Sequence, residues 1–151
     1  MTHDALTHDA LKAQGWKPRT LPGFAGLIGP LWTRKEGPDW AYGILATPAH
    51  TNPAGLVHGG LLMSLIDHAM STVAWEHLGK VACVTVQMDT RFMGAAQAQQ
   101  FVEAHASVER ATASLVFTRG AIRVDGQDIV TASAVLKVLR APSGGQDPGA
   151  A

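Results

Sequence analysis

An apolar segment from about Gly60 to Leu78 constrains the fold of this chain most, because it predicts a helix that is hydrophobic almost all round. A helix of this kind is enclosed by protein rather than exposed on a surface, so the rest of the chain must wrap around it. The exception is a narrow stripe of small and polar residues whose spacing of four, three and four places them on one face. We expect a substrate or a partner subunit to approach this stripe, which consists of Gly60, Ser64, Asp67 and Ser71.

Strand patterns dominate the chain on both sides of this helix. Apolar and polar residues alternate, or β-branched residues accumulate, in the ranges 31–35, 40–47, 84–89, 101–108, 115–124 and 129–139. Residues 36–39 and the pair Asp125-Gly126 are turn signals. One long helix and a sheet of about five strands indicate an α+β domain, with an antiparallel sheet that has one solvated or partner-facing side and curls round the helix.

The two ends of the chain differ from this central domain, which we place at residues 21–140. Residues 1–20 are an N-terminal extension that repeats Thr-His-Asp-Ala-Leu at positions 2–6 and 7–11. A local duplication explains the repeat better than a solenoid or a metal site, and we expect a frayed helical start with Thr7 as the N-cap. Residues 21–30 mix glycine and proline with apolar residues and predict a packed, irregular approach to the core, and residues 141–151 predict a disordered tail.

Composition argues against several classes of function. The formal net charge is +0 and the pI is about 7.1, so no basic face argues for nucleic acid. The chain carries no signal peptide pattern, and no run reaches the roughly 18 apolar residues of a membrane span. A single cysteine, Cys83, excludes an intramolecular disulfide framework and fits a reducing compartment. We therefore expect a cytoplasmic protein in which Cys83 packs as a small apolar residue of a strand.

The loop before the helix holds the clearest functional motif, since residues 52–60 read Asn-Pro-Ala-Gly-Leu-Val-His-Gly-Gly. Adjacent glycines let the backbone turn tightly and let a ligand come close to it. A helix that opens on glycines presents free N–H groups and the positive end of its dipole, a place for a negative oxygen. With Asp67 two turns further on in apolar surroundings, the pattern predicts hydrolysis of an acyl compound.

This Asn-x-x-Gly-x-x-His-Gly-Gly pattern, followed by an Asp inside the helix, resembles the hotdog-fold acyl-CoA thioesterases, specifically their phenylacetyl-CoA thioesterase-like branch. The resemblance extends over roughly Leu21 to Leu139. It implies a hotdog fold, which is a curved antiparallel sheet wrapped round one long central helix. It also implies an acyl-CoA substrate, no cofactor, and a homodimer or dimer-of-dimers tetramer in which each active site is built from two subunits.

The resemblance assigns catalytic roles to four residues. Asp67 matches the nucleophile or general base, and Gly59 offers its backbone N–H to the thioester oxygen. Asn52 matches a residue that contacts the carbonyl or the attacking water, and Thr85, from the partner subunit, matches a hydroxyl that assists the carboxylate. Each residue also has a plain structural explanation: a hydrogen-bonded Asp without catalysis, a glycine needed only for the turn, a turn residue before a proline, and an ordinary strand threonine.

His58 has a side chain suited to general-base chemistry, but we expect it to hold the loop through its ring nitrogens. A metal site made from His58, Asp67 and His68 lacks helical ligand spacing, and we reject it.

Gly60, Ser64, Phe92 and Arg110 are candidates for substrate binding. Arg110 matches a basic position that meets the nucleotide phosphates of CoA, and Arg91 and Arg119 are further candidates from charge alone. The chain has Gly94-Ala95 where relatives often carry a proline, and it lacks their Gly-Lys or Gly-Arg pair near residues 112–113. These departures leave open how CoA is held. Four large apolar residues line either an acyl pocket or the core: Met63, Met70, Trp75 and Phe92.

Two other functions remain as alternatives. A hotdog hydratase or dehydratase would carry an Asp-x-x-Pro-x-His segment, which the sequence does not contain. A non-catalytic module that binds acyl-CoA or a small ligand fits the same fold, and CoA binding without thiol release would distinguish it.

Overall fold

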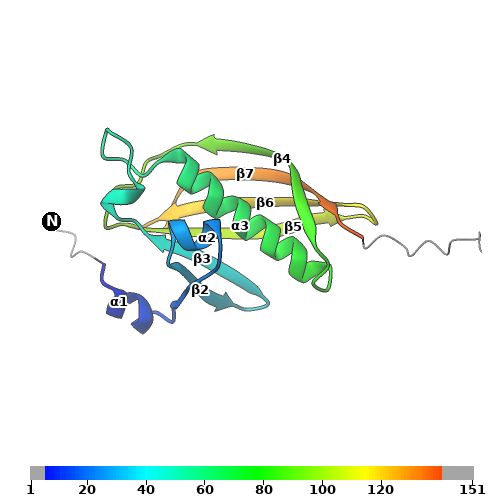
Figure 1. Cartoon of the computed structure of the whole chain (residues 1–151), viewed down its shortest axis with the longest axis horizontal. Coiled ribbons are helices and arrows are strands. Elements are labelled where there is room, and N and C mark those ends of the chain that lie inside the picture. Colours follow the sequence, from blue (N-terminus) through cyan, green and yellow to red (C-terminus); the bar gives the residue numbers. More distant parts are fainter. Residues whose placement is uncertain (1–5, 141–151) are drawn as a thin grey trace, which may run out of the picture.

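The computed structural model describes residues 6–140. Within this range seven strands form one antiparallel sheet, and the long helix α3 (Gly59–His77) lies along one face of it (Figure 1). The strand order is β1-β2-β3-β5-β6-β7-β4. The strands are β1 (Lys17–Arg19), β2 (Leu31–Glu36), β3 (Asp39–Leu45), β4 (Cys83–Phe92), β5 (Phe101–Ala111), β6 (Leu115–Val124) and β7 (Gln127–Val138). This is the α+β hotdog architecture that the resemblance implies.

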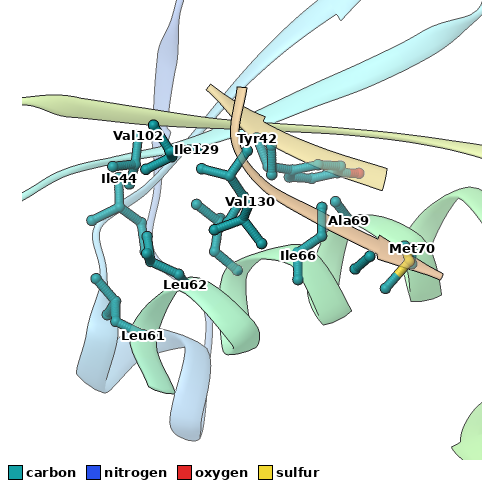
Figure 2. Close-up of a cluster of buried hydrophobic side chains, with 14 of the residues drawn as sticks. Tyr42, Ile44, Leu61, Leu62, Ile66, Ala69, Met70, Val102, Ile129 and Val130 are labelled. Atoms are coloured by element: carbon teal, nitrogen blue, oxygen red, sulfur yellow. The ribbon is translucent and has the colours of Figure 1, made fainter. Parts of the chain in front are cut away.

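The main core lies between α3 and the sheet, as Figure 2 shows. Leu62, Ile66 and Met70 project from α3 onto the sheet, where Ile44 and Val130 meet them. These helical residues recur every four positions, and the strand residues that face them alternate with outward-facing ones. The periodicities of the sequence therefore identify the two surfaces that pack together.

The turns follow the local sequence signals. Gly37 adopts φ 59° between β2 and β3, and both Asp125 (φ 51°) and Gly126 (φ 78°) have positive φ between β6 and β7. Two successive residues with positive φ match the twist of a tight hairpin, which confirms the predicted turn at that pair. Helix α3 ends just before Gly79, whose φ of 67° suits a left-handed residue after a helix.

The sheet has seven strands, more than the expected number of about five. The predicted strand ranges are all present with shifts of a few residues at their ends, and β1 is an additional short strand that pairs with β2. All three residues of β1 are exposed and Pro18 lies at its centre, so neither alternation nor propensity marks it in the sequence.

The N-terminal extension is not frayed where the structure describes it. Helix α1 (His8–Ala13) has the predicted N-cap, because the Thr7 hydroxyl accepts a hydrogen bond from the backbone N–H of Ala10. Its Leu11 is fully buried in a second apolar cluster, together with Trp16, Trp32, Ala41 and Phe101. This cluster, rather than the main core, anchors the extension. The first repeat copy up to residue 5 and the tail predicted at 141–151 lie outside the described residues.

Residues 21–30 contain a helix that the sequence does not reveal, α2 (Phe24–Ile28), which lies beside α3 (Figure 1). The predicted packing of this segment is wrong in part, because Phe24 and Leu27 are 62% and 82% exposed. Neither is α3 fully enclosed, since Met63 is 38% exposed. The single chain therefore leaves apolar surface uncovered beside the polar stripe of α3.

Candidate active site

The loop at residues 51–58 leads directly into the start of α3. His58 is the N-cap residue, and its Nδ1 accepts a hydrogen bond of 2.9 Å from the backbone N–H of Gly60. Its own backbone N–H donates to the His50 carbonyl at 2.8 Å. His58 thus has the structural role predicted for it, through one ring nitrogen, and it takes the Gly60 N–H out of reach of a ligand.

Gly59 differs from Gly60, because its backbone N–H has no acceptor in the described part of the chain. A first-turn N–H points out of the helix at the positive end of the dipole. A β-carbon at Gly59 would lie 3.4 Å from the ring atoms Cε1 and Cζ of Phe92, so the exposed Phe92 ring flanks this donor. The structure therefore brings Gly59 and Phe92 together at one end of α3.

Asn52 is the residue that shapes the loop. Its side-chain oxygen accepts hydrogen bonds from the backbone N–H groups of Ala54 (2.9 Å) and Leu56 (3.2 Å). This is the turn role that the sequence left open. Because the oxygen is occupied, only the amide N–H₂ group of Asn52 is left to meet a substrate, and it can only donate.

Asp67 and Thr85 are in direct contact. The Thr85 hydroxyl on β4 donates a 2.7 Å hydrogen bond to Oδ1 of Asp67 on α3, and the Ser71 hydroxyl lies 3.4 Å from that of Thr85. The other carboxylate oxygen of Asp67 has no hydrogen-bond partner within residues 6–140. Thr85 was expected from a partner subunit, but the structure supplies it from the same chain, because β4 folds back beside α3.

An apolar pocket of about 190 Å³ opens next to Asp67, between α2 and α3. Its apolar lining comes from Phe24, Ala25, Ile28, Leu31 and Leu65, and its polar lining from Ser64, Asp67 and His68. The Ser64 hydroxyl already donates to the Gly60 carbonyl at 2.7 Å. Sequence reasoning did not identify α2 as a wall of the site, and it considered His68 only as a metal ligand. Met70, by contrast, is fully buried in the core.

Two ionisable groups near Asp67 have shifted pKa values. Burial lowers the pKa of His68 below its ordinary 6.5, although the negative charge of Asp67 opposes this shift, so the imidazole is neutral at pH 7. Burial, with a contribution from the Asp67 charge, raises the pKa of the Cys83 thiol above 9.0. A protonated thiol is a poor nucleophile, which agrees with the expectation that Cys83 only packs.

The arginine candidates lie elsewhere on the chain. Arg110 is exposed near the end of β5, and the neighbouring Val108 shares a hollow with Glu76 and His77, close to the C-terminal end of α3. Arg91 and Arg119 line two larger hollows of about 470 and 420 Å³, whose other lining residues include Thr131 on β7. None of the three lines the pocket beside Asp67 within one chain.

The described residues contain no group of three or more histidine, cysteine or acidic side chains placed to hold a metal ion. Across the same range, none of the helices has both the length and the apolar character needed to cross a membrane.

Comparison with known proteins gives a consistent result. The model of the thioesterase superfamily matches residues 54–131. A presumptive esterase of Pseudomonas aeruginosa is 25% identical over 126 residues, which cover 81% of this chain and 93% of the relative. The crystal structure of a presumptive thioesterase from Ralstonia eutropha JMP134, described as related to phenylacetic acid degradation, is 27% identical with a TM-score of 0.70, and the match covers 80% of this chain and 92% of that one. A Bacillus halodurans protein crystallised with CoA shares the fold, at 22% identity and a TM-score of 0.62, over 65% of this chain and 70% of the other.

Proposed function

Because this chain belongs to the thioesterase superfamily, we propose that it hydrolyses an acyl-CoA thioester to the free acid and CoA. Thioester hydrolysis in general is the chemistry of the family, and the CoA part is supported by the protein of similar fold that was crystallised with CoA. The observation that carries the proposal is the 2.7 Å hydrogen bond from Thr85 to Asp67 beside an apolar pocket. It fixes one oxygen of the carboxylate and leaves the other free to act.

In the proposed reaction, Asp67 removes a proton from water while the water oxygen attacks the thioester carbon. The carbonyl oxygen becomes negative and accepts hydrogen bonds from the Gly59 backbone N–H and the Asn52 amide. The C–S bond then breaks, the CoA sulfur takes up the proton, and the acid leaves. A direct attack by the Asp67 carboxylate, followed by hydrolysis of the resulting anhydride, gives the same products. Losing one donor of this kind typically costs about a hundredfold to a thousandfold in rate.

One chain does not bring these groups close enough together. Gly59 and Asp67 are eight positions apart on α3, which corresponds to about 12 Å along the helix axis. A base within about 3 Å of a water, which lies about 3 Å from the carbonyl carbon, must be within about 10 Å of the oxyanion donor, even when these atoms are fully extended. We therefore propose that Gly59 and Asn52 of one subunit act together with Asp67 and Thr85 of its partner.

The surface of the chain supports such a pairing. Strand β4 forms an edge of the sheet, and its Val84 and Val86 are 43% and 55% exposed. An edge strand with apolar side chains is a ready surface for another strand. If two copies paired along this strand, the polar stripes of their two α3 helices would lie side by side. We propose a homodimer on this basis, and the further pairing of dimers into a tetramer remains a prediction.

We propose that Arg110 contacts the phosphates of CoA. A partner subunit would have to bring it near Gly59, because Arg110 of the same chain lies toward the other end of α3. We also propose a cytoplasmic location, supported by the free, partly buried Cys83.

Release of thiol from a panel of aromatic and straight-chain acyl-CoAs, read with a thiol-reactive dye, tests the function. Wild type is compared with Asp67→Ala and with Asp9→Ala, a control that removes an exposed carboxylate from helix α1. We expect release by wild type and by the control, and almost none by Asp67→Ala with its fold retained. Full activity of Asp67→Ala would disprove the mechanism. CoA binding without release by wild type would favour the non-catalytic binding module.

A further inference from the structure

Among the polar side chains that line the pocket beside Asp67, that of His68 makes no hydrogen bond to the residues that the structure describes. The Ser64 hydroxyl is bonded to the Gly60 carbonyl, and Asp67 is bonded to Thr85. The hydrogen bond that the structure gives His68 within residues 6–140 is to its backbone carbonyl and leaves both ring nitrogens unpaired, and the ring lines the same pocket. An imidazole of this kind is available to a ligand.

The His68 ring is held in place rather than free to turn away. It packs edge-to-face on Tyr42, with ring centroids 4.9 Å apart and planes at 81°. Tyr42 is itself a core residue of β3, only 7% exposed. The helix around His68 is also fixed, since the Thr72 hydroxyl donates to the His68 carbonyl at 2.8 Å. A ring positioned in advance loses little freedom when it binds a ligand.

The size and lining of the pocket indicate what it would hold. A cavity of roughly 150 Å³ lined by apolar side chains accommodates benzene, so a pocket of about 190 Å³ has room for a ring or short chain and one more polar atom. A neutral imidazole offers one donor and one acceptor, which is the complement of a hydroxyl group. When an apolar acyl group fills the pocket, the imidazole is left without a hydrogen-bond partner, and this costs more free energy in apolar surroundings than in water.

Building on the proposed function, we propose that His68 determines the specificity of this enzyme by selecting acyl groups that carry a hydrogen-bonding substituent over apolar acyl groups of the same size. The acyl group enters the pocket between α2 and α3 with its thioester at Asp67. Its distal hydroxyl or carbonyl oxygen then meets the His68 imidazole, and the walls from Phe24 and Ile28 enclose its apolar part.

Pairs of substrates matched in size test this role. Para-hydroxyphenylacetyl-CoA is compared with para-methylphenylacetyl-CoA, and omega-hydroxypentanoyl-CoA with hexanoyl-CoA. We expect wild type to show a kcat/KM ratio of about ten in favour of the hydroxyl member of at least one pair, as one neutral hydrogen bond supplies. His68→Leu should bring this ratio to about one or below, and His68→Gln, which retains a donor and an acceptor, should keep part of it.

The kcat/KM ratio is measured on one preparation with both members of a pair. The fraction of folded enzyme is therefore the same for both substrates and does not change the ratio. His77→Leu, which removes an exposed histidine from the same helix, is the matched control and should keep the wild-type ratio. A wild-type ratio of one or less in both pairs, or an unchanged ratio in His68→Leu, would overturn the inference and leave the thioesterase function standing. No release from any thioester by wild type would overturn both.

Discussion

At the scale of single residues, the hydrogen bond from Thr85 to Asp67 is the contact on which the proposed chemistry depends most. The acceptor is a carboxylate, and bonds to charged groups contribute about 1.5–3 kcal/mol. The bond spans α3 and β4, with Ser71 next to it. In the proposed mechanism Thr85 is therefore a positioning residue, because it would act on the substrate through Asp67.

Replacing Thr85 by valine, which has the same shape without the hydroxyl, should lower kcat by about tenfold to a hundredfold. KM should change little, since Thr85 does not bind the substrate. Thr85→Ser keeps the donor and should restore most of the rate. Steady-state kinetics with one good acyl-CoA measures the split between kcat and KM. Equal losses in Thr85→Val and Thr85→Ser would show that packing of the side chain matters instead of its hydroxyl.

The shifted pKa of His68 gives a residue-scale prediction for stability. Its folded pKa lies below the unfolded value of 6.5, so the unfolded chain takes up this proton first as the pH falls. Stability should therefore decrease from about pH 7.5 to about pH 5.5. Burial also lowers the pKa of His50, which contributes in the same direction.

Thermal melts of wild type and His68→Gln over this pH range measure the effect. We expect the variant to lose less Tm than wild type on acidification, because Gln cannot take up a proton. His77→Gln serves as the control for loss of a histidine. Identical slopes for wild type and His68→Gln would show that the His68 proton is not linked to folding.

At the scale of elements, the two glycines that open α3 have different reasons to be glycine. A β-carbon at Gly60 would lie 3.0 Å from Nδ1 of His58, so a side chain there disturbs the N-cap. At Gly59 the close atoms within residues 6–140 belong to the exposed Phe92 ring, at 3.4 Å. Glycine at position 60 therefore preserves the N-cap of α3, and we propose that glycine at position 59 keeps the backbone N–H accessible to the substrate.

We therefore predict that Gly59→Ala and Gly60→Ala separate activity from stability. Gly59→Ala should keep the wild-type Tm within a few degrees and lose at least about tenfold in kcat/KM, because its methyl group crowds the oxyanion donor. Gly60→Ala should lower stability by about 0.5–2 kcal/mol through loss of the cap. Denaturant unfolding and steady-state kinetics measure both quantities. A large stability loss in Gly59→Ala with no change in the activity per folded molecule would contradict the assignment.

The same contrast explains how much the sequence can predict. Strands, the long helix, the Asp125-Gly126 turn and the Thr7 cap depend on local patterns, and the structure confirms them. Helix α2 is five residues long with no side-chain cap, and it packs beside β2 and against residues of α3 that are far along the chain. The wall that α2 contributes to the pocket, and the position of the unpaired His68 ring in that pocket, depend on this tertiary packing. No local sequence pattern therefore predicts them.

At the scale of the whole molecule, the separation of Gly59 and Asp67 sets the geometry of any dimer that shares its sites. In an isologous pair, two antiparallel helices are related by a twofold axis, and residue i of one faces residue j of the other. For Gly59 of one subunit to face Asp67 of its partner, the twofold axis must cross each α3 helix halfway between positions 59 and 67. That point lies next to Met63. Met63 is the exposed apolar residue of α3, as a position at such a contact requires.

A mixture of two inactive variants tests whether the sites are shared. Gly59→Val blocks the oxyanion donor and keeps Asp67, while Asp67→Ala removes the base and keeps Gly59. In a mixed dimer with shared sites, one site receives both defects and the other receives none. Random mixing of equal amounts makes half of the dimers mixed, so we expect about a quarter of the wild-type activity from two preparations that are each nearly inactive.

If each site were contained in one chain, every chain in the mixture would carry a defect, and refolding the variants together would restore nothing. Size-exclusion chromatography with light scattering shows whether mixed dimers form, and a different affinity tag on each variant isolates them. Pure mixed dimers should then have about half of the wild-type activity, since one of their two sites is intact. Inactive mixed dimers of the correct mass would refute the shared site, because Gly59 and Asp67 would both be present in functional form on opposite subunits without making a catalyst.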